Sequence, residues 1–285
     1  MQTSKITVGM VLRHALMLLV LMIFLFPIYW MLVTSFKPAQ EVLTRPPTFV
    51  FEPTFDNYRY AFEQADFTLF IRNTVVIAGL STLLVISFGS LASYSFARYN
   101  PGDGHILFFI LTTRMMPGIA VVMPFFLIFR DLGKTTFGQL FALGLDQIGA
   151  LVVAYTVFNL PFAIWLMYSF FQDIPTELEH SARLDGYNRL QVFLRVVLPL
   201  AAPGIAVTAI FSLMFAWNEF LFGYILTRDA ARTITVGVSG FQTQQGILWG
   251  PLAAAAVVCI LPMLGVALVL QRYMVRGLTF GAVRG

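Results

Sequence analysis

Long runs without a charged residue constrain this sequence more than any other feature. Residues 14–36 contain no Asp, Glu, Lys or Arg, and residues 73–97 are a second such run. Charged residues make up 11% of the chain, against about a quarter in soluble proteins. A soluble chain of 285 residues could not bury the apolar surface of a sequence that is 58% hydrophobic. The sequence therefore predicts a membrane protein.

Six segments are long and apolar enough to cross a bilayer, whose hydrocarbon core takes about 20 residues of helix. The third is interrupted only by Arg114 and the fifth only by Glu219. The first is longer than the apolar region of a signal peptide and no small-residue cleavage site follows it, so we expect it to be retained. We predict an all-α integral membrane protein with one transmembrane domain, residues 1–285, and spans at residues 14–36, 73–97, 105–129, 147–172, 198–227 and 249–271.

The distribution of basic residues orients these spans. An even number of spans places both termini on one side, and placing them in the cytoplasm puts the net charge of +4 on that side. Cytoplasmic loops carry such an excess of Lys and Arg. We therefore predict a multi-pass protein in a lipid bilayer with both termini in the cytoplasm. The loop between the fourth and fifth spans then also lies in the cytoplasm.

That loop, residues 173–199, is densely charged. Pro175 suits the first position of a helix, and Thr176 with Glu179 offers an alternative start by a capping box. Gly186 suits the end of this helix, because glycine accepts the left-handed backbone of a helix C-terminus. The segment therefore predicts a first helix of about ten residues that ends at Gly186.

The rest of the loop predicts a second helix. Asp185 is placed to bond backbone groups in the turn, and apolar residues then recur at helical spacing until Pro199 ends the pattern. A helix pair could lie on lipid headgroups, but its four acidic side chains would be repelled by an anionic membrane surface. Insertion into a groove of a partner protein fits this composition better.

Other function classes lack the residues they need. GKT at residues 133–135 is similar to the end of a phosphate-binding loop, but Ile128 stands where that loop needs Gly. The three His residues are scattered without Cys or carboxylates at ligand spacing, so we expect no metal site. The sequence contains a single cysteine, Cys259, so no disulfide can form within the chain. Because the basic residues follow the ends of apolar runs, we expect no nucleic-acid binding.

Arg114 is a first candidate for the path of a solute. A mid-helix Arg costs about 2.5–3.5 kcal/mol to insert, so it must face a partner or an aqueous path. Pro117 and Pro124 are expected to break the helix here and to free carbonyls that the guanidinium or a substrate hydroxyl could use. The alternative is a structural ion pair with Glu219.

Trp217, Asn218 and Glu219 are a second candidate, in the fifth span. Amides and carboxylates bind sugar hydroxyls, and aromatic faces cover the apolar surface of a sugar ring. The alternative is a packing helix with an aromatic belt near the outer interface.

The charged loop resembles the cytoplasmic motif of membrane subunits of ATP-binding-cassette importers. That motif reads Glu-Ala-Ala, three residues and Gly, and closes with a hydrophobic residue, any residue, Leu and Pro. Ala182 and Gly186 match its core, and Asp185 is the acidic residue usual before the Gly. The end of the motif is matched by Val196, Leu198 and Pro199, whereas His180 and Ser181 replace the Glu-Ala pair. The stretches WMLVTSFKPAQEVLTRPPTF, FDNYRYAF, WNEFLF and QRYMVRGLTFGAVRG are similar to the maltose-type carbohydrate permease subunit.

This resemblance implies a type I importer permease fold in a bacterial-type inner membrane. It implies four kinds of partner: a homologous second permease subunit, a cytoplasmic ATPase dimer, an extracytoplasmic sugar-binding protein and a carbohydrate substrate. The chain itself then binds no cofactor, because ATP and Mg belong to the ATPase. The residues implied to form the coupling helix, seated in a cleft of the ATPase, are Glu179, His180, Ser181, Ala182, Asp185 and Gly186.

Two outer segments and the C-terminal tail are expected to contact partner proteins or, for the tail, to be disordered. The outer segments 37–66 and 228–248 are expected to dock the binding protein, with the loop 240–246 reaching its sugar cleft. The tail, residues 276–285, has too few apolar residues to form a helix. This tail is either disordered or an extended segment that contacts the ATPase through Arg276 and Gly281.

Two rival classes fit less well. A stand-alone secondary carrier should show inverted repeats and several acidic residues within its spans, and only Glu219 is of that kind. A membrane enzyme needs a catalytic constellation, and none is recognisable in the sequence.

Overall fold

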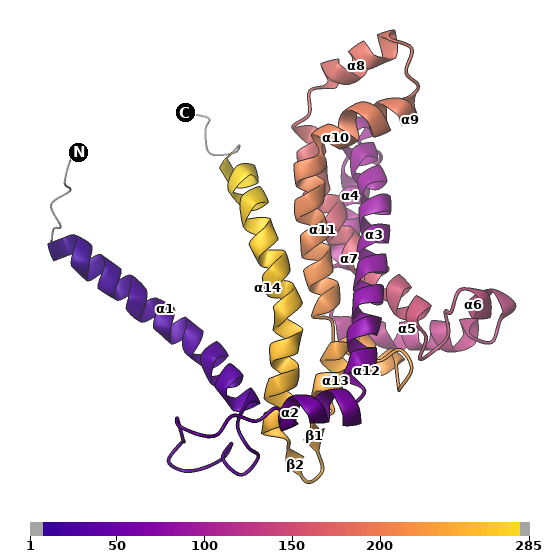
Figure 1. Ribbon diagram of the computed structural model, residues 1–285. Helices are drawn as coiled ribbons and strands as arrows, with labels where there is room; N and C mark the ends of the chain where they lie inside the picture. Colours follow the sequence, from indigo (N-terminus) through magenta and orange to yellow (C-terminus); the bar gives the residue numbers. More distant parts are fainter. Residues whose placement is uncertain (1–7, 280–285) are drawn as a thin grey trace. The chain divides into compact units, whose positions relative to one another are not determined.

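The computed structural model describes the backbone of residues 8–279 and the side chains of residues 9–268. It forms two compact units. The first contains the chain up to Phe67 together with Val238–Leu261, and the second contains Thr68–Gly237 together with the chain from Pro262. Regular structure in both units is almost entirely helical (Figure 1).

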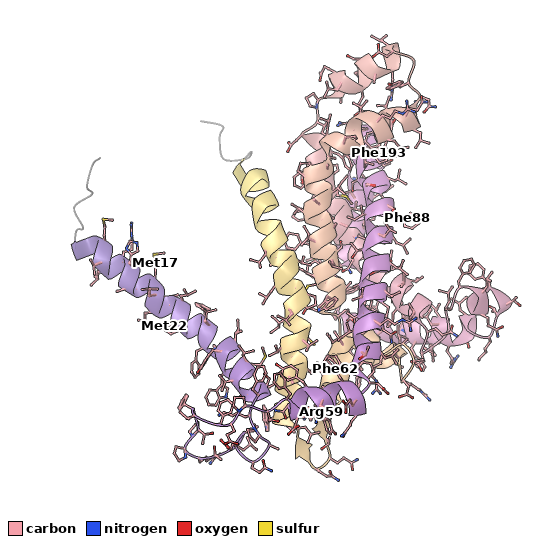
Figure 2. All side chains as sticks on the ribbon, in the orientation of Figure 1. Met17, Met22, Arg59, Phe62, Phe88 and Phe193 are labelled. Atoms are coloured by element: carbon pink, nitrogen blue, oxygen red, sulfur yellow. The ribbon has the colours of Figure 1, made fainter. Side chains whose placement is uncertain are left out.

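The first unit begins with α1 (Val8–Ser35), an apolar helix whose residues 9–29 are all exposed. Met17 and Met22, each 62% exposed, stand out from it in Figure 2. A helix that is hydrophobic all round suits lipid and not water. The remaining elements of this unit are α2 (Asp56–Arg59), the π-helix η1 (Tyr60–Gln64), the antiparallel hairpin β1 (Gln242–Thr243) and β2 (Gly246–Ile247), and the first part of α14 (Trp249–Thr279).

Buried polar groups fix the irregular segment after α1. The amine of Lys37 is buried, donates to the Thr48 carbonyl at 2.6 Å and lies 4.6 Å from the centre of the Trp30 ring. The amide of Asn57 donates to the Lys37 carbonyl at 2.8 Å. Internal partners of this kind let an irregular backbone leave water without unsatisfied groups.

Three long helices frame the second unit: α3 (Phe67–Tyr99), α7 (Ile148–Gln172) and α11 (Ala202–Trp217), seen side by side in Figure 1. α11 approaches α7 closely at Gly204, where a Cβ atom would lie 2.3 Å from a ring carbon of Phe170. Small residues permit such close helix contacts in membranes. The shorter elements are α4 (His105–Thr113), α5 (Gly118–Leu132), α6 (Thr136–Leu140), α8 (Thr176–Leu184), α9 (Arg189–Val192), the π-helix η2 (Phe193–Val197), α10 (Leu198–Leu200), α12 (Leu221–Leu226) and α13 (Ile234–Ser239).

Four of the described helices are long and apolar enough to cross a membrane, namely α1, α3, α7 and α14. Two bent pairs also qualify when each pair counts as one span. The first pair is α4 with α5, bent by 88°, and the second is the helix of Arg189–Leu200 with α11, bent by 78°. This gives up to six spans, in the order expected from the sequence.

The third expected span is therefore not one continuous helix. Its break coincides with Pro117, which precedes α5 in an extended conformation with ψ 129°. Proline lacks an N–H and cannot continue the hydrogen-bond ladder from α4. The expected second break at Pro124 is wrong, because Pro124 lies inside α5. The proline φ is compatible with a helix, so the ring removes one hydrogen bond there without ending the helix.

The fifth expected span also ends early. α11 stops at Trp217, and residues 218–220 separate it from α12. By contrast, α14 continues to Thr279, so the expectation that the tail is not helical is wrong for residues 276–279. Extending an existing helix by a turn is easy once the apolar span has nucleated it. Residues 280–285 lie outside the described residues.

Candidate functional site

The turn between α8 and α9 is built as the sequence predicts. Gly186 has φ +90°, a conformation that glycine adopts without strain, and its N–H donates to the Arg183 carbonyl at 3.0 Å. Asn188 then caps α9, because its side chain accepts from the N–H of Gln191 while the Gln191 side chain accepts from the N–H of Asn188. This capping box was not anticipated, although Asn followed by Gln three residues later is its usual signature.

The start of α8 differs from the expected capping box. Pro175 is the residue before the helix, and no side chain caps the helix there. Glu179 does not reach back to the backbone, because side chains of α3 hold its carboxylate. The residue is buried, with 5% of its surface exposed. Its Oε1 pairs with Nε of Arg98, and its Oε2 accepts from the hydroxyl of Tyr94 at 2.6 Å.

A second bond of Arg98 completes this network. The Nη2 atom donates to the carbonyl of Ile174 at 2.8 Å, just before Pro175. The side chains of Arg98 and Glu179 are 8% and 7% exposed, so the ion pair lies away from water. We call Tyr94, Arg98, Ile174 and Glu179 the anchor. Sequence reasoning missed Tyr94 and Arg98, although Arg98 ends its apolar run on the side assigned to the charged loop.

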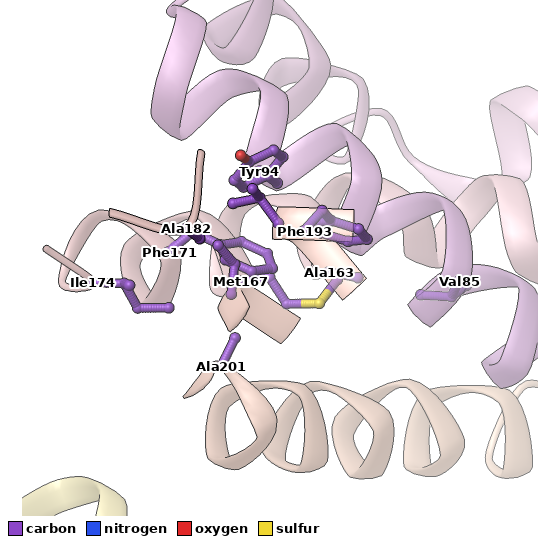
Figure 3. Packing of buried hydrophobic residues seen from close by; sticks show 11 residues of the cluster. Val85, Tyr94, Ala163, Met167, Phe171, Ile174, Ala182, Phe193 and Ala201 are labelled. Carbon is purple, nitrogen blue, oxygen red and sulfur yellow. The ribbon is translucent and has the colours of Figure 1, made fainter. Parts of the chain in front are cut away.

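An apolar cluster shares Tyr94 and Ile174 with the anchor. Figure 3 shows side chains from α3, α7, α8 and the helices that follow it, gathered around Phe171 and Phe193. Ala182 is the only apolar residue that α8 itself buries in this cluster. The members are Val85, Tyr94, Ala163, Met167, Phe171, Ile174, Ala182, Val192, Phe193, Val197 and Ala201.

The remaining predicted coupling residues lie on the outside of the turn. His180, Ser181, Asp185 and Gly186 are exposed, and Leu184 beside them is 90% exposed. The carboxylate of Asp185 accepts no backbone hydrogen bond within the described residues, contrary to expectation, because the N–H groups of the turn already bond to α8 carbonyls. The side chain of Arg276 and the whole of Gly281 lie outside the described residues.

The second helix of the loop does not stop at Pro199. It runs from α9 through η2 and α10 to Leu200, and the bend follows at Ala201. The π-helical turn directly before Pro199 explains this, because its wider hydrogen-bond spacing makes room for a ring that would otherwise clash with the preceding turn.

Arg114 lies at the break between α4 and α5. Its Nη1 atom donates to the carbonyl of Phe158 at 3.0 Å. Its guanidinium lies 4.1 Å from the centre of the Phe158 ring and 5.4 Å from that of Phe215. The expected alternative, an ion pair with Glu219, is not present among the described residues, because the Glu219 carboxylate has other partners.

Those partners are backbone groups of α12. The Glu219 carboxylate accepts from the N–H groups of Leu221 and Phe222, each at 3.0 Å, and so caps this helix. Trp217 is buried, whereas Asn218 is exposed and donates to a carbonyl of α11. The three residues predicted as one sugar site therefore have three different surroundings. Of these three side chains, Asn218 is the one that faces outward.

A clamp that the sequence did not reveal holds residues 228–231. The carboxylate of Asp146 accepts from all four backbone N–H groups, at 2.9–3.2 Å. Burial alone would raise the pKa of Asp146, but these four donors outweigh it and hold the pKa below its ordinary value. Asn73 also donates to the carbonyls of Ala230 and Arg232. No local pattern marks such a contact, because its partners are backbone groups far apart in sequence.

Comparison with known proteins identifies the family of this chain. Residues 85–280 match the family described as "Binding-protein-dependent transport system inner membrane component". A probable ABC transporter permease protein of Sinorhizobium fredii is 37% identical over 92% of this chain and 91% of its own length. A trehalose/maltose transport system permease protein of Thermococcus litoralis is 34% identical over 94% of each chain.

Solved structures agree on the fold. A chain of a bacterial ABC transporter involved in the import of alginate superposes with a TM-score of 0.76 and 21% identity, over 95% of this chain and 99% of that one. The family match covers the anchor, the α8–α9 turn and both bent pairs of helices. The sequence resemblance is thereby confirmed: this chain belongs to the inner-membrane components of binding-protein-dependent transport systems, as a multi-pass permease subunit of an ABC importer.

Proposed function

We propose that this permease imports a sugar, a polyol or a related carbohydrate. Three relatives carry this proposal, each aligned over more than 90% of this chain. Their names specify transport of trehalose or maltose, of sulfoquinovosyl glycerol in Agrobacterium fabrum, and of diacetylchitobiose in Streptomyces coelicolor. The substrates differ, but all of them contain a sugar ring.

The chain works with partners that supply energy and substrate. We propose that it pairs with a homologous second permease subunit, that an ATPase dimer binds ATP and Mg in the cytoplasm, and that a sugar-binding protein delivers substrate from outside. Both termini then lie in the cytoplasm, on the same side as α8. The exposed position of His180, Ser181, Asp185 and Gly186 supports their assignment as the surface of α8 that meets the ATPase. We assign Arg276 and Gly281 to the same interface on the resemblance of the tail.

Arg114 and Asn218 are the proposed residues of the solute path. Arg114 keeps guanidinium N–H groups beyond the one that bonds to Phe158, and Asn218 is exposed. Trp217 and Glu219, predicted with them, are assigned to support of the path, because Trp217 is buried and the Glu219 carboxylate caps α12.

Co-purification and substrate binding test this proposal. The chain, expressed with the products of its neighbouring genes, should purify with an ATPase whose activity rises when the binding protein is added. Calorimetry of that binding protein against sugars, polyols and sugar acids should identify the substrate. A chain that purifies alone and transports a solute with an ion gradient would instead support a secondary carrier.

A further inference from the structure

The helix α8 buries very few of its side chains against the rest of its unit. Of its nine residues, Glu179 and Ala182 alone are buried. Ala182 contributes one methyl group to the apolar cluster. An apolar contact of this kind does not fix the orientation of the helix. Glu179 contributes a carboxylate whose two oxygens bond to two different side chains of α3. The buried side chain of α8 that makes directed polar bonds is therefore Glu179, and those bonds go to α3.

The anchor also holds the chain where it enters α8. Arg98 bonds to Glu179 within α8 and to the carbonyl of Ile174 before it. One side chain at the end of α3 thus ties down two points of the α7–α8 corner. A charge-assisted network of this kind, out of water, resists both sliding and rotation of the helix it holds.

We propose that Tyr94, Arg98 and Glu179 are positioning residues that make α8 and α3 one rigid body, so that a displacement of α8 by the ATPase is delivered to α3. The inference rests on the proposed function, because it takes the ATPase as the source of movement. It assigns no direct contact with the ATPase to Glu179, whose carboxylate is buried against α3. The surface that meets the ATPase and the contact that passes on its movement are then different residues of one helix.

A distance measurement tests the rigid body itself. Spin labels are placed at Leu91 of α3 and Thr176 of α8, both exposed, in a Cys259→Ser background. Pulsed electron paramagnetic resonance of the complete complex then compares the resting state with the state trapped by ATP and vanadate. In the otherwise native chain we expect one narrow distance that trapping does not change. In Glu179→Gln we expect a broadened distance that shifts on trapping.

Coupling of ATP hydrolysis is the second readout. Stimulation of the ATPase by the binding protein should fall several-fold in Glu179→Gln and Arg98→Ala. The exchanged pair Arg98→Glu with Glu179→Arg should recover part of it. The matched control is Glu177→Gln, which removes the same charge from an exposed position of α8 and should keep native stimulation.

Either of two results would overturn the inference. One is a change of the Leu91–Thr176 distance on trapping in the native chain, which would show that α8 moves independently of α3. The other is native distance and native stimulation in Glu179→Gln. Absence of any associated ATPase from the native preparation would instead refute the proposed function, and the distance in the resting state would still report on the anchor.

Discussion

Two arginines of the second unit, Arg98 and Arg114, are satisfied in opposite ways. Arg98 meets the carboxylate of Glu179 and a backbone carbonyl, in a network where every strong acceptor is used. Arg114 meets one carbonyl and the faces of Phe158 and Phe215, with no carboxylate. The first arrangement is closed, because each charge has its opposite. The second is open, because its charge is stabilised by neutral groups.

This difference determines what a substitution leaves behind. Removing one member of a closed pair strands the other charge in a buried position, which costs more than the pair itself contributes. Removing a cation from aromatic rings and a carbonyl strands nothing charged. A closed network is therefore suited to hold elements together, and an open one to receive a visiting polar group. The comparison predicts unequal effects at sites that look alike in sequence.

The largest effect is expected for Arg98→Ala. The unpaired Glu179 carboxylate would remain buried, at a cost of about 3–5 kcal/mol in the free energy of unfolding. The shift should be visible in thermal unfolding of the purified complex. Arg130→Ala is the control, because Arg130 pairs with Asp131 at the exposed C-terminal end of α5 and its loss should leave the midpoint unchanged. Equal midpoints of thermal unfolding for Arg98→Ala and Arg130→Ala would contradict the distinction between the closed and the open arrangement.

Gly186→Val should have the next effect. No atom lies within 4 Å of the position its Cβ would take, so the cost comes from φ +90° alone, about 1–3 kcal/mol. Transport should uncouple from hydrolysis while the chain stays in the membrane. Gly186→Asn tolerates the left-handed conformation and should retain most coupling. Normal uptake by the Val variant would contradict the assignment of this turn to the ATPase interface.

Asp146 tests a third case, a carboxylate held by backbone N–H groups. Asp146→Asn should lower stability at neutral pH by about 1 kcal/mol, a small figure because the site is half exposed. A carboxyl whose folded pKa is lowered stabilises the protein above its ordinary pKa and loses that contribution as the pH falls through the folded value. The difference in the free energy of unfolding between the native chain and Asp146→Asn should therefore become smaller as the pH falls. A constant gap would mean that the charge contributes nothing.

The smallest effect is expected for Arg114→Met. Loss of the ring contacts, about 0.5–2 kcal/mol, is offset by relief from holding a cation in the membrane, so the net change should stay within about 1 kcal/mol. Stability of the double variant with Glu219→Ala should equal the sum of the singles. If the double variant were more stable than that sum, an ion pair between Arg114 and Glu219 would be supported after all. If Arg114→Met impaired solute uptake while the complex stayed assembled, the assignment of Arg114 to the solute path would be supported.

Sequence reasoning was most successful where a local rule decides the structure. The apolar runs predicted the order of the helices, and Gly186 predicted its turn. It failed where a residue had more than one possible partner. Glu179 could cap α8 or meet Arg98, and the choice depends on α3 lying beside it, which no local pattern encodes. Glu219 is an alternative partner for Arg114 in the sequence, because both charges lie in spans, yet its carboxylate accepts from N–H groups of α12.

The bend at Arg114 has a consequence for how the chain is assembled during synthesis. At about 1.5 Å per residue, neither the nine residues of α4 nor the fifteen of α5 reach across a hydrocarbon core of about 30 Å. These two pieces rest against α7 and α12, which the ribosome delivers later. Residues 105–132 are therefore synthesised before either neighbour exists. Their set of neighbours is complete only when residues 221–226 have been made.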